Sequence, residues 1–426
     1  MLKYPADLLF FHDTASFTPK GWHETLSVLR DPKDSAAVNA LLRHLVSFAS
    51  DFSLSGNIWQ FWLTHILMTH ENAFTLTCER QHANDEATLL KLAEADYDFI
   101  KSLFTLDLQQ FGPLQMFSSY QPLNADIQST RVGNTIKALC SDLVSCSTTF
   151  DFMKRMAVYY ENFGVGIYGL YKAFRISDDD QGLNLVPVTD DTDVTFDDLI
   201  GLEMQKQILR ENTEAFLNGF HANNVLLYGD SGTGKSTSIH ALMHDYFDKG
   251  LRLVELSKQD RRLLPQVLAS IKKRNYHFII YLDDLSFEEN ESDYKELKAM
   301  LEGALEKRSD RILIYATSNR RHLIRETWTD RNDMEYQNDI HHSDTMEEKL
   351  SLASRFGITI YYSKPNAKEY LHIVNKLAER NKIELDEKEL NDRARQWELR
   401  HGGMSGRTAS QLITWLSGEA GIKNIE

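Results

Sequence analysis

The sequence predicts an α/β protein in which a mainly helical N-terminal domain precedes a five-stranded parallel sheet and a helical region follows the sheet. Three observations predict this fold class. Residues 1–177 repeat apolar side chains at helical spacing, five short apolar segments alternate with helical stretches from residue 194 onward, and a glycine-rich loop follows the first of these segments. Strands that alternate with helices are typical of a parallel sheet with helices on both faces.

The composition of this 426-residue chain indicates two or three packed domains and excludes several classes of protein. Its net charge of −15 disfavours binding of nucleic acid or an anionic membrane over the whole surface, although a local basic patch can still bind either. No apolar run approaches the ~18 residues that a membrane span needs, and residues 1–17 lack the features of a signal peptide. Cys78, Cys140 and Cys146 have no metal-ligand spacing, so we expect reduced thiols in a cytoplasmic protein without membrane partners.

The N-terminal domain is expected to span residues 1–177. Residues 36–52 and 89–104 carry apolar side chains three and four positions apart, as amphipathic helices do. Residues 152–174 are rich in aromatic side chains, which we interpret as core or an interdomain seam in preference to a ligand or partner surface. The acidic run that follows is interpreted as a solvated linker over residues 178–193.

The α/β core is expected to span residues 194–363. Its strands are expected at residues 225–228, 251–256, 278–282, 312–316 and 358–362, with a helix over residues 294–307. Residues 364–426 are predicted to be helical, and Asn366 with Glu369 resembles a capping box at the start of the first helix.

A phosphate-binding loop is predicted where residues 229–236 fit the pattern G-x-x-x-x-G-K-[ST] between a strand and a helix. Glycines let the backbone curl around a polyphosphate, and the following helix contributes its positive N-terminal end. Lys235 is expected to reach the β- and γ-phosphates, and the Ser236 hydroxyl to bind Mg²⁺. The candidate phosphate-binding residues are Gly229, Asp230, Ser231, Gly232, Thr233, Gly234, Lys235, Ser236 and Thr237.

Two carboxylates, Asp283 and Asp284, follow the third expected strand. They stand at the carboxyl end of a buried parallel strand, which is the edge where α/β sheets bind ligands. We expect Asp283 to bind Mg²⁺ through water and Asp284 to polarise the attacking water.

Three further polar residues are candidates for the same chemistry. Asn319 follows the fourth strand and either orients the attacking water or belongs to an ordinary loop. Arg355 precedes the fifth strand and is either structural or a finger that reaches the nucleotide of a neighbouring subunit. Arg407 lies in the first turn of a helix that Ser405 is expected to cap. A cation there opposes the helix dipole, which suggests an anionic partner.

Together these motifs resemble the AAA+ ATPases over residues 194–426. In that resemblance, residues 195–201 match the segment that lies against adenine, with Ile200 and Gly201 as candidate nucleotide contacts. Asn319 matches sensor 1, Arg355 the arginine finger and Arg407 sensor 2. The segments YLDDLSFE, ATSNRRHLI and EEKLSLASRFGI are similar to the bacterial ATP-binding group DUF815.

The resemblance implies a fold and an activity. The fold is a parallel sheet in the strand order 5-1-4-3-2, with residues 364–426 as a helical lid. The activity is hydrolysis of ATP with Mg²⁺ between the subunits of a homo-oligomer, either a ring or an open spiral, which remodels or loads a protein or nucleic-acid client. A slow ATP-gated switch is the alternative, and a small-molecule kinase is a third hypothesis that leaves Asn319, Arg355 and Arg407 without a common role.

The chain departs from the AAA+ pattern at two places. Asp284 stands where the family has a glutamate, and its shorter reach favours slow hydrolysis. The loop over residues 257–262 has no aromatic residue, which argues against a threading unfoldase. Its cations Lys258, Arg261 and Arg262 are interpreted as a solvated loop or as a surface for nucleic acid or an acidic partner. Residues 320–349 are interpreted as a polar insertion that contacts a partner or moves.

Overall fold

The computed structural model divides into two compact units, residues 1–171 and residues 172–426, which are described separately. None of the helices in its described part is long and apolar enough to cross a membrane. The described residues are 8–12, 19, 21–81, 87–124, 129–179, 182–189, 194–286, 297, 301, 310–319, 352 and 354–423.

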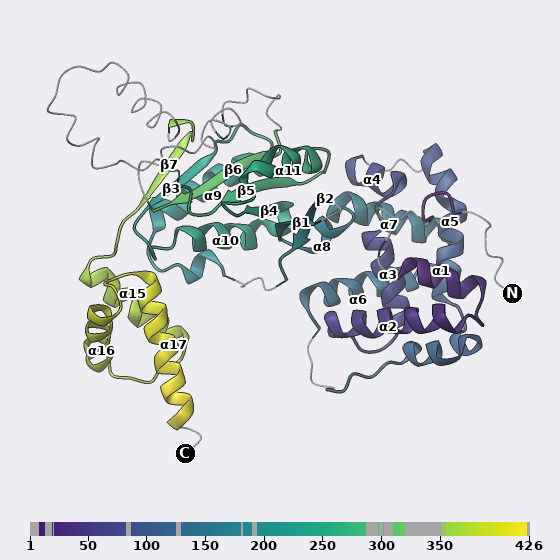
Figure 1. The fold of residues 1–426 in the computed structure, drawn as a ribbon, viewed down its shortest axis with the longest axis horizontal. Coiled ribbons are helices and arrows are strands. Elements are labelled where there is room, and N and C mark those ends of the chain that lie inside the picture. Colours follow the sequence, from purple (N-terminus) through teal and green to yellow (C-terminus); the bar gives the residue numbers. More distant parts are fainter. Residues whose placement is uncertain are drawn as a thin grey trace. The chain divides into compact units, whose positions relative to one another are not determined.

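The first unit is built from helices, coloured purple to blue in Figure 1. They are α1 (Trp22–Arg30), α2 (Ser35–Asp51), α3 (Ile58–Thr69), α4 (Ala73–Arg80), α5 (Thr88–Phe104), the 3-10 segment η1 (Leu108–Ser118), α6 (Arg131–Val144), α7 (Thr149–Phe163) and the short α8 (Ile167–Leu170). Side chains cap several of these helices; Asp34, for example, accepts hydrogen bonds from the N–H groups of Ala36 and Ala37.

Aromatic side chains form much of the core of this unit. Tyr97 and Tyr160 are fully buried, and the Tyr97 hydroxyl donates to the Tyr160 hydroxyl, which donates to the carbonyl of Leu67. Buried aromatic hydroxyls need such partners, because an unsatisfied polar group in a core is costly. The aromatic run at residues 152–174 is therefore mainly core, although Phe163 is exposed.

The second unit holds a sheet of seven strands in the order β2-β1-β4-β5-β6-β3-β7. The strands are β1 (Ala173–Asp179), β2 (Gly182–Pro187), β3 (Val225–Gly229), β4 (Leu251–Leu256), β5 (His277–Leu282), β6 (Ile312–Ser318) and β7 (Ile358–Tyr362). All neighbouring pairs are parallel except β1 with β2. The five predicted strands are confirmed, in the order 5-1-4-3-2 that the AAA+ resemblance implies.

The sheet has two strands more than predicted at one edge, and they occupy part of the stretch interpreted as a linker over residues 178–193. Strands β1 and β2 form an antiparallel hairpin, and β1 pairs with β4 through residues 173–175. The acidic residues of the run, such as Asp178 and Asp179, fall at the turn end of this hairpin, beyond the part of β1 that pairs with β4. An acidic run can therefore include the end of a strand whose first residues pair with the rest of the sheet.

Helices cover both faces of the sheet. Helices α9 (Glu203–Leu217) and α10 (Lys235–Tyr246) pack on one face, and α11 (Leu264–Ile271) lies on the other side in Figure 1. The face under α9 and α10 is formed by alternate strand residues, as the pleat requires; they include Val225, Leu227, Ile279, Tyr281, Tyr315 and Ile360. The helix predicted over residues 294–307 lies outside the described residues, except for Leu297 and Leu301.

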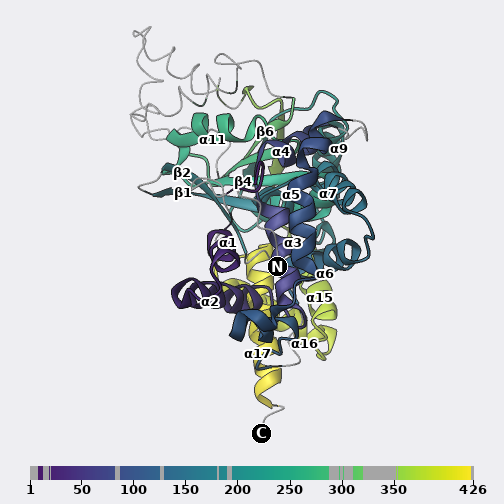
Figure 2. The same cartoon turned by 90° about the vertical axis from the view of Figure 1, so that its right-hand side faces the viewer.

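A three-helix bundle ends the chain, drawn in yellow in Figures 1 and 2. It consists of α15 (Ala367–Arg380), α16 (Glu387–Arg400) and α17 (Gly406–Lys423), and it has its own core, which includes Tyr370 and Leu412. The predicted capping box is confirmed, because the Asn366 side chain accepts from the N–H of Glu369 while Glu369 accepts from the N–H of Asn366.

Candidate functional site

The glycine-rich loop joins the end of β3 to the start of α10, as predicted. Gly229 has a φ of 140°, and a Cβ there would lie 2.0 Å from the Tyr362 carbonyl oxygen. Gly232 and Gly234 have φ values of 76° and 97°, which disfavour residues with a Cβ. Within the described part of the chain, no side chain caps the N-terminus of α10. Its first N–H groups are therefore available to an anion at the positive end of the helix dipole.

Lys235 is the first residue of α10 and is held inside the loop. Its Nζ atom donates to the carbonyl oxygens of Gly229 (2.9 Å) and Asp230 (2.7 Å) and to Oδ1 of Asn319 (3.1 Å). Burial lowers the pKa of Lys235, while the carboxylates of Asp230 and Asp284 act in the opposite direction. All three hydrogen-bond acceptors are uncharged, so the ammonium can exchange them for phosphate oxygens.

Three hydroxyl groups converge on Oδ1 of Asp283. They belong to Ser236 (3.0 Å), Tyr281 (2.5 Å) and Thr317 (2.6 Å). Burial acts to raise the pKa of Asp283, but the hydrogen bonds from Thr317, Tyr281 and Ser236 outweigh it and lower the pKa below its usual value. The site thus holds an ionised carboxylate next to a serine hydroxyl, a donor set of the kind that Mg²⁺ prefers.

Asp284 lies in a turn that bends back toward β6. Its φ of 46° is in the left-handed region, which is unusual for a residue other than glycine. Its N–H donates to Oγ1 of Thr317 at 3.0 Å, and its Oδ1 accepts from Nδ2 of Asn319 at 2.8 Å. Because Oδ1 of Asn319 accepts from Lys235, one amide connects the lysine of the loop to the second carboxylate.

A cavity of about 1290 Å³ brings most of the predicted site residues together. It is bordered by the glycine-rich loop, the ends of β5 and β6, the segment before α9, and the bundle of α15, α16 and α17, which is called the lid below. The predicted residues on its wall are Ile200, Gly201, Ser231, Gly232, Thr233, Gly234, Lys235, Ser236, Thr237, Asp283, Asp284, Asn319 and Arg407. Gly229, Asp230 and Arg355 are not on the wall.

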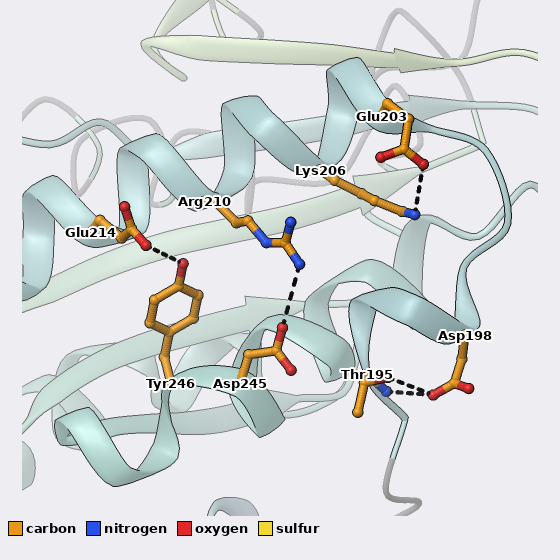
Figure 3. A network of polar contacts seen from close by, with 8 residues as sticks. All are labelled: Thr195, Asp198, Glu203, Lys206, Arg210, Glu214, Asp245 and Tyr246. Carbon is orange, nitrogen blue, oxygen red and sulfur yellow. Dashed lines mark hydrogen bonds and ion pairs between the residues drawn. The ribbon is translucent and has the colours of Figure 1, made fainter.

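Figure 3 shows the polar contacts that support the segment over residues 195–201. The N–H and hydroxyl of Thr195 both donate to Asp198. The Arg210 guanidinium lies 4.7 Å from the centre of the buried Phe196 ring and forms an ion pair with Asp245 at 3.8 Å. The segment is therefore anchored between α9 and the end of α10, with Ile200 and Gly201 facing the cavity.

The lid reaches the phosphate loop through the start of α17. Ser405 caps this helix as predicted, because its Oγ accepts from the N–H of Thr408. The N–H of Arg407 donates to the Gly232 carbonyl at 3.3 Å, and Arg407 lines the cavity. Among the residues that the structure describes, none forms an ion pair with the exposed Arg407 guanidinium. The expectation of an anionic partner for Arg407 stays a prediction.

Arg355 lies apart from this cavity. It is exposed in the turn just before β7, which is an edge strand of the sheet. It does not line the cavity of its own chain. Its action on the nucleotide of another subunit stays a prediction.

The interpretation of Arg261 as a solvated or partner-facing residue is wrong, whereas Lys258 and Arg262 are exposed. Arg261 is only 8% exposed, and its guanidinium donates to the carbonyls of Asp283, Asp284 and Ser286 at 3.4 Å each. Sequence spacing gave no signal for this contact, because it depends on β4 and β5 being neighbours in the sheet.

Thr317 and Tyr281 are further site residues that the sequence analysis missed. Both donate to Asp283, and although they lie in the quoted segments YLDDLSFE and ATSNRRHLI, neither was assigned a role there. Thr317 had one available signal: it precedes Asn319 in the polar end of β6. The lid also contributes wall residues that had no signal, including His372, Ile373 and Leu377 of α15.

No metal-ion cluster of three or more His, Cys, Asp or Glu side chains occurs within the described ranges. The polar insertion predicted at residues 320–349 lies outside those ranges. Cys78, Cys140 and Cys146 are free thiols, as expected.

Comparison with known proteins matches residues 170–420 to the family model described as "Protein of unknown function (DUF815)". Among solved structures, the chain is similar to the Thermotoga maritima RuvB Holliday junction branch migration motor, at 18% identity and a TM-score of 0.37. That alignment covers 52% of this chain and 63% of the RuvB chain, less than two thirds of its length. The FIGL-1 AAA domain in complex with ADP matches at 20% identity and a TM-score of 0.36, covering 52% of this chain and 72% of that one.

Proposed function

Because the chain belongs to the DUF815 family and has the fold of the AAA+ P-loop ATPases, we propose that it binds ATP with Mg²⁺ and hydrolyses it. The observation that carries this proposal is the set of contacts around Asp283 and Asp284. One carboxylate is joined to the loop serine, and the other is joined through Asn319 to the loop lysine. We assign the first carboxylate to metal binding and the second to water activation, the two tasks that ATP hydrolysis requires.

The residues have separate tasks in the proposed reaction. Lys235 and the N–H groups at the start of α10 hold the phosphates, and Ser236 with Asp283 holds Mg²⁺. Asp284 takes the proton from the attacking water, and Asn319 keeps the Asp284 carboxylate oriented. When bound, Mg²⁺ neutralises charge that develops on the β- and γ-phosphate oxygens.

We propose that the nucleobase lies against Ile200 and Gly201. These residues and the apolar side chains of Leu202, Ile373 and Leu377 line one cavity with the phosphate loop. A mostly apolar pocket with a few polar groups is typical of a site for an aromatic base.

The proposed reaction takes place between subunits of a homo-oligomer. Arg407 lines the cavity of its own chain, whereas Arg355 is exposed beside an edge strand and away from that cavity. A finger that supplies positive charge to a neighbour's phosphate would have this placement. The client is a protein or nucleic acid that ATP turnover remodels or loads.

A second candidate is a slow ATP-gated switch, in which binding assembles the subunits and hydrolysis is rare. The favouring observation is the short Asp284 side chain, whose Oδ1 accepts a hydrogen bond from Asn319. Steady-state turnover per subunit distinguishes the two candidates.

The proposed function is tested with the parental protein, Lys235→Ala, and Lys249→Ala as a matched control outside the cavity. Ligand at about 100 times its Kd adds ~2.7 kcal/mol to the free energy of unfolding, so Mg-ATP should raise the melting temperature of the parental and control proteins. Lys235→Ala should show little shift. Products should be ADP and phosphate. An equal shift in Lys235→Ala, or a phosphorylated metabolite as product, would refute the proposal.

A further inference from the structure

The turn that carries the two carboxylates is held from both sides, by β6 and by the 3-10 segment η4 (Arg261–Leu263) that follows β4. On the β6 side, Thr317 accepts from the N–H of Asp284 through its hydroxyl and from the N–H of Leu285 through its carbonyl. On the β4 side, Arg261 donates to the carbonyls of Asp283 and Asp284. The turn therefore depends on contacts that come from separate parts of the chain.

Arg261 is suited to this position because a guanidinium has five donors in a rigid plane. Nη2 donates to the carbonyls of Asp283 and Asp284, and Nη1 to that of Ser286. Carbonyls in an irregular turn have no ladder partner, so a donor from outside the turn satisfies them. A lysine ammonium, which is a compact point charge, does not reproduce this planar arrangement.

The left-handed backbone conformation of Asp284 makes the orientation of its carboxylate depend on this support. A left-handed φ at a residue with a side chain costs free energy and persists only where the surroundings hold it in place. That conformation determines where the Asp284 carboxylate points, because the side chain has few rotatable bonds. Loosening the turn would move the carboxylate without removing any group from the cavity.

We propose that Arg261 is a positioning residue for Asp284, which it holds in the orientation needed for hydrolysis. This inference rests on the proposed function, since it assigns Asp284 the role described above. Arg261 also connects the carboxylate turn to a surface loop. In that loop Lys258 and Gln259 are exposed, and the Ser257 hydroxyl donates to Asp260 at 2.5 Å.

The test compares Arg261→Gln with Arg262→Gln. The two variants lose the same charge from adjacent residues, but Arg262 is exposed. Arg261→Gln should lower kcat at least ~10-fold, since small displacements of a catalytic group have effects of that order or larger, and should leave the Kd for ATP within about threefold. Arg261→Lys should recover part of the lost kcat, and Arg262→Gln should behave as the parental protein.

A readout independent of turnover is amide hydrogen exchange in the peptide that contains Asp284 and Leu285. Arg261→Gln should speed exchange there and leave α10 protected. Parental kcat and exchange in Arg261→Gln would overturn the inference, as would a loss of ATP affinity equal to the loss of kcat. If Arg261→Gln speeds exchange but the parental protein does not hydrolyse ATP, Arg261 still holds the turn in place. That result would refute the proposed function and not the contact between Arg261 and the turn. If Arg261→Gln does not fold, Arg261→Lys decides by the same two measurements.

Discussion

Nδ2 of Asn319 donates a 2.8 Å hydrogen bond to Oδ1 of Asp284. The other end of the same amide accepts from the ammonium of Lys235 at 3.1 Å. An amide can make both contacts only in one orientation, with its oxygen toward the cation and its nitrogen toward the carboxylate. Asn319 thus connects Lys235, the proposed phosphate-binding group, to Asp284, the proposed base.

Asn319→Ala should lower kcat by ~10²-fold or more, the usual effect of removing one oriented donor from an active site. The Kd for ATP should change little, because Lys235 keeps two carbonyl acceptors. Single-turnover kinetics and equilibrium binding measure the two quantities. Asn319→Asp is the matched control, since it keeps the size but removes the donor, and it should be as impaired as the alanine variant. Parental turnover in either variant would contradict the assigned role.

Substitutions of Asp283 and Asp284 should have different effects, one on Mg²⁺-dependent binding and the other on turnover. Asp283→Asn should weaken the Mg²⁺-dependent part of ATP binding, because the carboxylate that faces Ser236 loses its charge. Asp284→Asn should bind ATP normally but lower turnover by ~10²–10⁴-fold, as expected when a general base is removed. Titration of Mg²⁺ against a fixed ATP concentration, followed by a phosphate-release assay, separates the effects. If Asp284→Asn turns over like the parental protein, another residue activates the water.

Thr317 should matter for Mg²⁺ through its hydroxyl alone. Thr317→Val keeps the shape but removes the donor to Asp283 and the acceptor for the Asp284 N–H. Loss of such a partner behind a metal ligand typically costs 10–100-fold in metal affinity, and we expect that range. Thr317→Ser keeps the hydroxyl and should remain close to the parental affinity. Equal weakening in both variants would show that the methyl packing, and not the hydrogen bond, is important.

Mixing subunits should show that Arg355 acts in trans and Arg407 in cis. A finger is worth ~10³–10⁵-fold in related phosphoryl transfers, so Arg355→Ala alone should have little turnover. Added Lys235→Ala subunits bind no ATP but retain Arg355, and they should restore part of the activity. They should not rescue Arg407→Ala, whose defect stays with its own nucleotide. The oligomeric mechanism would be refuted if the protein has the mass of a monomer in the presence of ATP and its turnover per subunit does not depend on protein concentration.

Arg380 should stabilise the lid against the segment that we propose contacts the base. At the end of α15, its guanidinium donates to Oδ1 of Asp198 at 3.2 Å and to the carbonyl of Asp197. An exposed ion pair is worth ~0.2–1 kcal/mol, so Arg380→Ala should weaken ATP binding by up to about fivefold, mainly through faster dissociation. Arg393→Ala is the control, because Arg393 pairs with Glu389 and Glu419 inside the lid. The same dissociation rate in the two variants would argue against a bridge that affects the nucleotide.

Some long-range contacts could be anticipated from sequence because they follow from topology. Asp283 and Asn319 end neighbouring parallel strands, so their proximity follows once both strands are recognised. The phosphate loop is encoded even more locally, since Gly229, Gly232 and Gly234 occupy backbone conformations that suit glycine.

The sequence by itself determined the five core strands, the phosphate loop and the residues at the strand ends, because apolar periodicity and glycine spacing act over a few residues of chain. Only the tertiary structure decided that the β1–β2 hairpin joins the sheet, that Thr317 and Tyr281 share Asp283 with Ser236, and that Arg261 is buried beneath the carboxylate turn. These contacts join residues whose local sequence gives no sign of a partner. They form because the order β4-β5-β6 places the ends of separate strands side by side, where buried donors and acceptors must satisfy one another.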